Sequence, residues 1–219
     1  MPRARFVKEG DAIWMSHLDL MRVLQRSFRR AGLLLAHSQG FTPHPELSLA
    51  LPLSVGVSSE CEIMDFKLAE GQDESDLCAR LNRALPAGVR ILEVYDSGEK
   101  IKHLRRLRIE ITLEYDRGVP AGAIEAITEL FSREEITFEK TTKSGAVVTQ
   151  NLMDMMTNVA VAAQDGHTLR LCCDISAQDP ALNPARIPEA IERELPDSAP
   201  DFSSIHRAET LTEDGTVFR

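Results

Sequence analysis

The sequence lacks the cysteine patterns that bind metals or build disulfide frameworks. Its four cysteines include no C-x-x-C pair, and Cys172 and Cys173 are adjacent inside a strand-like run. Zinc ribbons, iron–sulfur motifs and disulfide-rich folds all need regular cysteine spacing. We therefore expect a reduced, cytoplasmic protein whose cysteines fill its core, with no metal and no cofactor.

Long apolar runs are absent as well. No stretch reaches the roughly 18 apolar residues that a membrane-spanning helix needs. The N-terminal sequence MPRARFVKEG is too polar for a signal peptide. The sequence therefore predicts a protein that has no membrane partner.

The motifs of common enzyme classes are also missing. There is no G-x-x-x-x-G-K-[ST] phosphate loop, G-x-G-x-x-G, H-E-x-x-H or G-x-S-x-G. His17, Asp19 and His44 are the candidates for a metal or acid–base cluster. The spacing of His17 and Asp19 places them on different faces of a helix, so we assign no catalytic and no metal-binding residue.

Charge is unevenly distributed along the chain. The net charge is −9, yet residues 1–45 hold seven Lys or Arg against three Asp or Glu. Local fields rather than totals steer anionic ligands. The N-terminal region is therefore the candidate surface for an anion.

Residues 16–32 predict an amphipathic helix within this basic region. Ser16 is a suitable N-cap, Asp19 can complete a capping box, and Gly32 suits the position after the last turn. Apolar residues at spacings of three and four predict the buried stripe: Leu18, Met21, Leu24, Phe28 and Ala31.

Arginines occupy the other face of this helix. They are Arg22, Arg26, Arg29 and Arg30. Guanidinium groups bind phosphate in a two-pronged geometry, which favours an anion-binding row. The alternative is a solvated face on which Arg29 and Arg30 complement the helix dipole.

A polar loop with one aromatic residue follows the helix, in residues 37–45 (HSQGFTPHP). Phe41 lies among hydroxyl, amide and imidazole groups, where it can stack a base. The alternative is that Phe41 folds back onto the core. We expect the arginine row and the Phe41 turn to converge on one concave surface. Its ligand-binding residues are Ser16, His17, Asp19, Arg22, Arg26, Arg29, Arg30, Ser38, Gln39, Phe41, Thr42 and His44.

Element order predicts an α+β fold of two tandem ferredoxin-like (split βαβ) units with antiparallel sheets, in domains 1–98 and 103–219. Domain 1–98 has strands at 3–8, 12–15, 46–57, 60–68 and 90–95 and helices at 16–32 and 73–85. The second, acidic domain has strands at 105–115 and 205–211, helices at 121–131 and 187–195, and hairpins around Lys143-Ser144-Gly145 and Asp165-Gly166.

Four segments resemble a bacterial family of unknown function, DUF2344. They are RFVKEG, SHLDLMRVLQRSFRRAGL, HSQGFTPHPELSLALPLSVGV and CEIMDFKL, and the resemblance covers residues 3–95 most strongly. It implies an accessory module that works with a radical SAM enzyme, because members are fused to or encoded beside one. This chain lacks the C-x-x-x-C-x-x-C cluster ligands, so the radical SAM enzyme would be a separate chain.

Two hypotheses from different classes follow. The first is a non-catalytic protein that binds RNA, either tRNA or rRNA, for a partner radical SAM enzyme, or that docks the partner. The second is a ferredoxin-like endoribonuclease that uses His17 or His44 as acid–base. A third hypothesis is a pure protein–protein adaptor.

Overall fold

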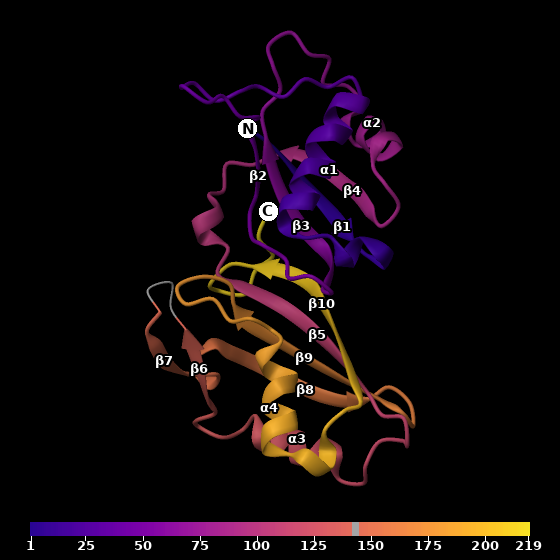
Figure 1. Cartoon of the computed structure of the whole chain (residues 1–219), viewed down its shortest axis with the longest axis vertical. Helices are drawn as coiled ribbons and strands as arrows, with labels where there is room; N and C mark the ends of the chain where they lie inside the picture. The colour runs from indigo at the N-terminus through magenta and orange to yellow at the C-terminus, as the bar shows by residue number, and fades with distance from the viewer. Residues whose placement is uncertain (142–144) are drawn as a thin grey trace. The chain divides into compact units, whose positions relative to one another are not determined.

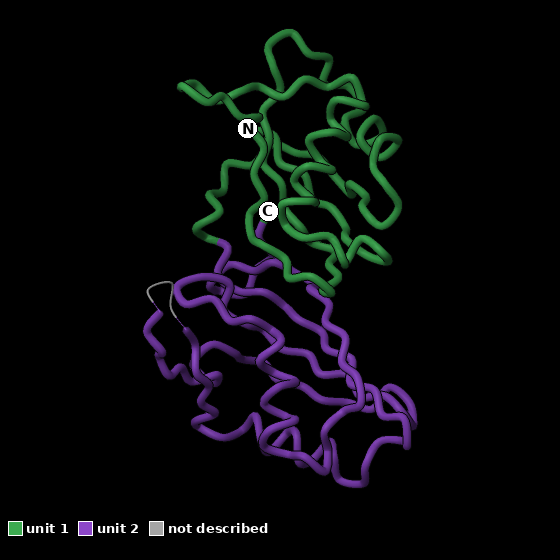
Figure 2. Tube along the Cα trace, viewed as in Figure 1, with its two compact units in different colours: residues 1–103, 219 green, residues 104–218 purple. Residues whose placement is uncertain are grey.

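The computed structural model describes residues 1–141 and 145–219 and shows an α+β protein. The chain divides into two compact units, residues 1–103 with Arg219 and residues 104–218 (Figure 2). The Lys143-Ser144 part of the predicted turn lies outside the described residues.

Unit 1 begins with a strand and a 3-10 turn that lead into its first helix, and its second helix follows β3 (Figure 1). Its elements are β1 (Pro2–Lys8), η1 (Gly10–Trp14), α1 (His17–Arg30), β2 (Leu47–Leu49), β3 (Ser58–Phe66), α2 (Leu77–Ala84), β4 (Val89–Asp96) and η2 (Ile101–His103).

The strands of unit 1 form an antiparallel sheet in the order β4-β1-β3-β2. Strand β1 pairs with β3 and β4, and the short β2 pairs with β3. Helices α1 and α2 cover one face of this sheet (Figure 1). The Phe28 ring of α1 packs on the Phe66 ring of β3 with centroids 4.9 Å apart. This contact lies in an apolar core that also buries Phe6, Leu24 and Leu81.

Residues 12–15 are not a strand, contrary to the prediction. Residues 12–14 belong to η1 and Met15 is its C-cap, and the carbonyls of Ile13 and Met15 accept hydrogen bonds from the buried Lys8 ammonium. Gly88 lies directly against this turn. Its carbonyl accepts from the Glu9 amide, and a Cβ at Gly88 (φ +81°) would be 2.3 Å from the Glu9 oxygen. The turn is thus fixed by tertiary contacts rather than by its own pattern.

Unit 2 has a similar order of elements, with an additional hairpin. It contains β5 (Arg106–Glu114), α3 (Ala123–Leu130), β6 (Thr137–Thr141), β7 (Val147–Asn151), η3 (Met153–Met155), β8 (Met156–Ala163), β9 (Thr168–Ser176), α4 (Arg186–Glu194), η4 (Pro196–Ser198) and β10 (Phe202–Leu211).

The main strands of unit 2 are antiparallel in the order β10-β5-β9-β8, and β6 pairs with β7 separately. The predicted hairpin around Asp165-Gly166 is confirmed as β8 and β9. Alternate residues of β5 are buried, as its sequence pattern predicted: Leu107, Ile109, Ile111 and Leu113. Ile127 of α3 and Ile187 of α4 are fully buried as well.

Two further predicted ranges in unit 1 were wrong. The helix predicted at 73–85 begins at Leu77, because Asp73 accepts a bond from the Ser75 amide in a preceding turn. The strand predicted at 46–57 is limited to Leu47–Leu49. Pro52 follows soon after, and proline cannot donate to a strand ladder.

Candidate functional site

Helix α1 begins as the sequence predicted. The Ser16 hydroxyl caps it by accepting a hydrogen bond from the Asp19 amide, and it also bonds the Asp19 carboxylate at 2.7 Å. The Ser16 hydrogen bond, followed by Arg22, lowers the pKa of Asp19 below its usual value. Gly32 follows the helix with φ +71°, a backbone angle that glycine adopts without strain. The capping box fixes where the arginine face of α1 starts.

The predicted apolar stripe was wrong at its first residue. Leu18 is 64% exposed, and Leu20 is buried instead. Leu20, Leu24 and Phe28 lie one turn apart, so they form one row against the sheet. Leu18 lies on the same exposed face as Arg22, four residues further along α1.

Arg22, Arg26 and Arg29 form the exposed arginine row of α1. Arg22 donates to Asp19 at 3.1 Å, but both side chains are mostly exposed, and such surface pairs contribute little. Within the described residues, Arg26 and Arg29 make no hydrogen bond or ion pair. Their guanidinium groups therefore keep all their donors for a ligand.

Arg30 has a different role from the one predicted. Its Nε and Nη2 donate to the Ala84 carbonyl at the end of α2, and Nη2 also donates to the Ser27 hydroxyl. These bonds hold the last turn of α1 against α2. Because Arg30 is bound to the protein itself, we leave it out of the exposed row.

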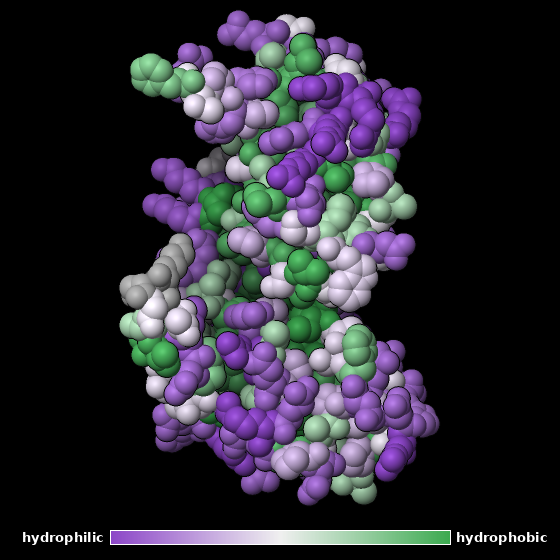
Figure 3. Space-filling view, in the orientation of Figure 1, coloured by the Kyte–Doolittle hydropathy of each residue, from purple (hydrophilic) through white to green (hydrophobic). Residues whose placement is uncertain are grey.

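A hollow of about 590 Å³ lies beside the arginine row. Its basic lining residues are Arg22, Arg26 and Arg29, and His37 and Pro45 line it as well. Figure 3 shows strongly hydrophilic side chains gathered over α1 and α2. The remaining lining residues are Gln25, Phe28, Leu33, Leu34, Leu35 and Ala69. A planar group with an attached phosphate matches such a mixed apolar and cationic lining.

The 38–44 loop is closed at its base by paired polar groups. The Ser38 amide donates to the His44 carbonyl at 2.9 Å, and the Ser38 hydroxyl contacts His44 Nδ1 at 2.9 Å. His37 and Pro45 extend this base as an antiparallel bridge. Phe41 is fully exposed, so the alternative in which it folds onto the core is wrong. The loop presents Phe41 to solvent from a fixed base.

The loop and the arginine row meet at the base of the loop. His37 and Pro45 line the hollow, whereas Ser38, Phe41 and His44 do not. Gln39 and Thr42 are exposed, and Ser16 and His17 lie at the other end of α1. The predicted convergence is therefore partial, with Phe41 outside the hollow.

The sequence pattern missed several residues of the hollow. Leu34 and Ala69 come from separate segments, and the Leu34 amide is held by the Gln72 side chain at 3.1 Å. Gln25 lies three residues after Arg22 and one turn before Arg29. This helical spacing is the signal within α1 that places Gln25 on the same face as the arginine row. Contacts between distant segments leave no local signal of this kind.

Residues 1–141 and 145–219 contain neither a metal-binding cluster nor a membrane-spanning helix. No group of three or more His, Cys, Asp or Glu is arranged to hold a metal ion there. In the same part of the chain, no helix is both long and apolar enough to cross a membrane. Burial raises the pKa of the Cys173 thiol to about 12, so this thiol stays protonated at neutral pH.

The fold and the hollow define an α+β protein with a basic helix face beside an exposed aromatic loop. The chain belongs to the DUF2344 family, described as an uncharacterized protein conserved in bacteria, whose model matches residues 2–184. A search of the curated proteins found no match.

Comparison with solved structures found matches at low sequence identity. A chain of the Cbf5-Nop10-Gar1 complex is 9% identical with a TM-score of 0.51, and the match covers 97% of this chain and 50% of that one. A chain of the archaeal box H/ACA sRNP Nop10-Cbf5 complex is 11% identical with a TM-score of 0.49, covering 99% and 50%. The chain thus spans half the length of these two chains, and the likeness to the first of them concerns the fold alone.

Proposed function

We propose that this protein is a non-catalytic accessory protein that binds RNA through α1 and serves a separate radical SAM enzyme. One observation carries the RNA proposal. Arg26 and Arg29 are exposed, make no bond within the described residues, and line a hollow that reaches the base of the Phe41 loop. Arginines hold the phosphates, and the exposed Phe41 ring stacks an unpaired base of the same strand.

The radical SAM partnership rests on the resemblance of residues 3–95 to proteins associated with such enzymes. The chain has no cluster-binding cysteine motif of its own, so the radical chemistry would belong to the partner. We further propose that both units are ferredoxin-like. The strand orders β4-β1-β3-β2 and β10-β5-β9-β8, each with two helices between strands, support this proposal.

The endoribonuclease reading has less support. His44 Nδ1 is engaged by the Ser38 hydroxyl, and His17 begins α1. No hydrogen bond joins the two histidines in the described part of the chain. Cleavage of RNA that disappears in His17→Ala or His44→Ala would nevertheless establish it.

The test compares two triple variants of equal charge. The first replaces Arg22, Arg26 and Arg29 by Ala. The control replaces three exposed basic residues of unit 2 by Ala: Arg117, Lys140 and Arg193. The readout is the binding of fluorescent oligouridylate between about 50 and 200 mM salt.

We expect the first variant to flatten the salt slope by about 2, since each phosphate contact on a single strand contributes about 0.7. The control should keep the wild-type slope. Equal slopes in all three proteins would refute binding through the arginine row. Co-purification from the native host tests the partnership, which fails if RNA is recovered without a radical SAM enzyme.

A further inference from the structure

A second basic hollow lies at the ends of α1 and α2. It has a volume of about 620 Å³ and is lined by Arg30, Ala31, Arg80, Arg83 and Ala84. Three of these five residues are arginines, and two of them were outside the predicted site. Arg80 has an acidic partner in Asp73, whose carboxylate lies 3.7 Å from Arg80 Nη1 and is mostly exposed. The hollow is therefore net positive.

Two of its arginines build the walls of this hollow. Arg30 of α1 donates to the Ala84 carbonyl at the end of α2. Arg80 of α2 donates in return to the carbonyls of Ala31 and Gly32, just beyond α1. Each helix end thus has its carbonyls bonded by a guanidinium from the other helix. This cross-capping offsets the negative ends of both helix dipoles, which would otherwise repel an anion.

Arg83 is the arginine that remains available. It lies exposed in the last turn of α2 and makes no hydrogen bond or ion pair within the described residues. In this respect it matches Arg26 and Arg29 of the first hollow.

The two hollows adjoin the same turn of α1. Arg29 lines the first hollow, and the next residue, Arg30, lines the second. Successive residues of an α-helix are about 100° apart around its axis, so the hollows lie on two sides of that turn. A ligand that occupies both must pass over the C-terminal end of α1.

We propose that the second hollow is a further phosphate site, which binds the continuation of a single RNA strand held by the arginine row. This inference rests on the proposed function and specifies its ligand as a strand long enough to reach both hollows. A charged groove that follows the backbone is how proteins bind single strands without reading their sequence. A single phosphate in one open hollow would release too few counterions to bind well at physiological salt.

The experiment uses the full chain and oligouridylates of increasing length. The variants are Arg83→Ala, Arg83→Lys and the control Arg90→Ala, which removes an exposed arginine of β4. Arg30 and Arg80 are left intact because they hold the helix ends. For long oligomers, Arg83→Ala should flatten the salt slope by about 0.7, corresponding to one phosphate contact. Arg83→Lys should restore the slope, and Arg90→Ala should leave it unchanged.

Short oligomers that fill the first hollow alone should bind wild type and Arg83→Ala equally. If Arg83→Ala keeps the wild-type slope at every length, the second site is refuted. The proposed function is still supported in that case if the Arg22, Arg26 and Arg29 triple variant loses binding. If that triple variant also binds as wild type, the proposed function itself fails. Competition by polyglutamate as strong as that by oligouridylate of equal charge would refute the RNA ligand in favour of an acidic protein.

Discussion

The two units share a strand order and a cross-strand ion pair at corresponding places. In unit 1, Arg3 of β1 lies opposite Asp65 of β3 and binds it through two nitrogens, at 2.6 and 3.0 Å. In unit 2, Arg108 of β5 lies opposite Asp174 of β9 and binds it at 2.9 and 3.1 Å. Both pairs join the first strand of a unit to the strand beside it. The two units therefore share this ion pair as well as their strand order.

The two pairs differ in which partner is buried. Arg3 is 3% exposed and also donates to Ser97 and Glu99. In unit 2 the carboxylate is the buried partner, with Asp174 4% exposed and Arg108 48% exposed. Burial alone would raise the pKa of Asp174, but hydrogen bonds from Arg108 and Asn158 outweigh it and lower that pKa. The arginine is therefore the more buried partner in unit 1, and the carboxylate is the more buried partner in unit 2.

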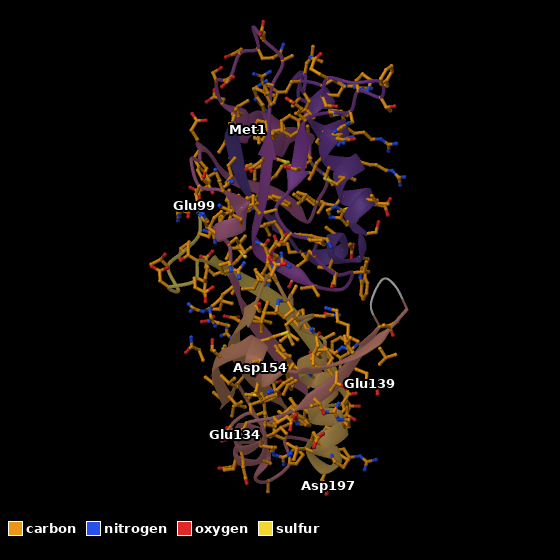
Figure 4. The ribbon with its side chains drawn as sticks, turned by 90° about the vertical axis from the view of Figure 1, so that its left-hand side faces the viewer. Met1, Glu99, Glu134, Glu139, Asp154 and Asp197 are labelled. Carbon is orange, nitrogen blue, oxygen red and sulfur yellow. The ribbon has the colours of Figure 1, made fainter. Side chains whose placement is uncertain are left out.

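The helices of the two units differ in charge. Helices α1 and α2 hold six arginines and one aspartate, whereas α3 and α4 hold two arginines and five glutamates. Figure 4 labels further exposed acidic residues of unit 2, among them Glu134, Glu139 and Asp197. One layout of strands and helices thus supports two surfaces of opposite sign, and only the basic one suits phosphate.

The largest effect should come from the cores, where the units are expected to behave alike. Phe28→Ala should cost about 3–5 kcal/mol and Ile127→Ala about 2–5 kcal/mol, because each leaves a cavity under a helix. Urea unfolding followed by circular dichroism measures both. The fluorescence of Trp14, the one tryptophan of the chain, reports on unit 1. If the free energy of unfolding falls by less than about 1 kcal/mol in one unit, the two cores do not behave alike.

The next effect distinguishes the two ion pairs. Asp65→Ala leaves a buried guanidinium and should cost about 3–5 kcal/mol. Arg108→Ala should cost about 1–3 kcal/mol, since Asp174 keeps its bond from Asn158. The same unfolding assay applies, with Arg90→Ala as a control expected within about 0.5 kcal/mol of wild type. If the Arg108 variant were less stable than the Asp65 variant, the bond from Asn158 would not be enough to stabilise the buried Asp174 carboxylate.

A smaller effect concerns how helices begin in the two units. Ser16→Ala removes the side-chain cap of α1 and should cost about 1 kcal/mol. The N-cap of α3 is Gly122, which has no side chain to cap the helix, so Gly122→Ser offers the reverse comparison. Its φ of +79° strains any side chain, and we expect destabilisation in place of a gain. Thermal unfolding measures both, and a stabilised Gly122 variant would show that the missing cap matters more than the strain.

The smallest effect is a dependence on pH. The pKa of Asp19 is lower in the folded protein, so its stabilising contribution is present above the usual value of about 3.9 and is lost as the pH falls through the folded value. In Ser16→Ala the main cause of this shift is absent. Between about pH 5 and 3, this variant should therefore lose less stability than wild type. Parallel curves for the two proteins would show that the Ser16 bond does not act on Asp19.

Local patterns predicted much of the fold. The cap at Ser16, the alternation in β5 and the β8–β9 hairpin all depend on residues near one another in sequence. Their chemistry is local, so the sequence alone suffices to place them. The 3-10 turn at Gly10–Trp14 was missed because Lys8 and Gly88 hold it from outside.

The candidate site could be predicted only in part. The arginine periodicity indicated the row, but nothing in it separates Arg29 from Arg30. The role of Arg30 depends on a carbonyl of α2, 54 residues further along the chain. Likewise, the base of the loop is fixed by a pairing of His37 with Pro45, whereas the exposure of Phe41 depends on the direction of the whole loop. Long-range contacts of this kind are set by the packed fold.

Gly88 lies outside α1, yet it restrains the segment that leads into this helix. Any larger residue there must push the Glu9 backbone and Ala12 outward, and the segment that would shift leads directly to the Ser16 cap. The orientation of the cationic face is thereby tied to a residue with neither charge nor side chain. We expect a larger residue at Gly88 to displace the backbone that leads into α1, and with it the start of the arginine face.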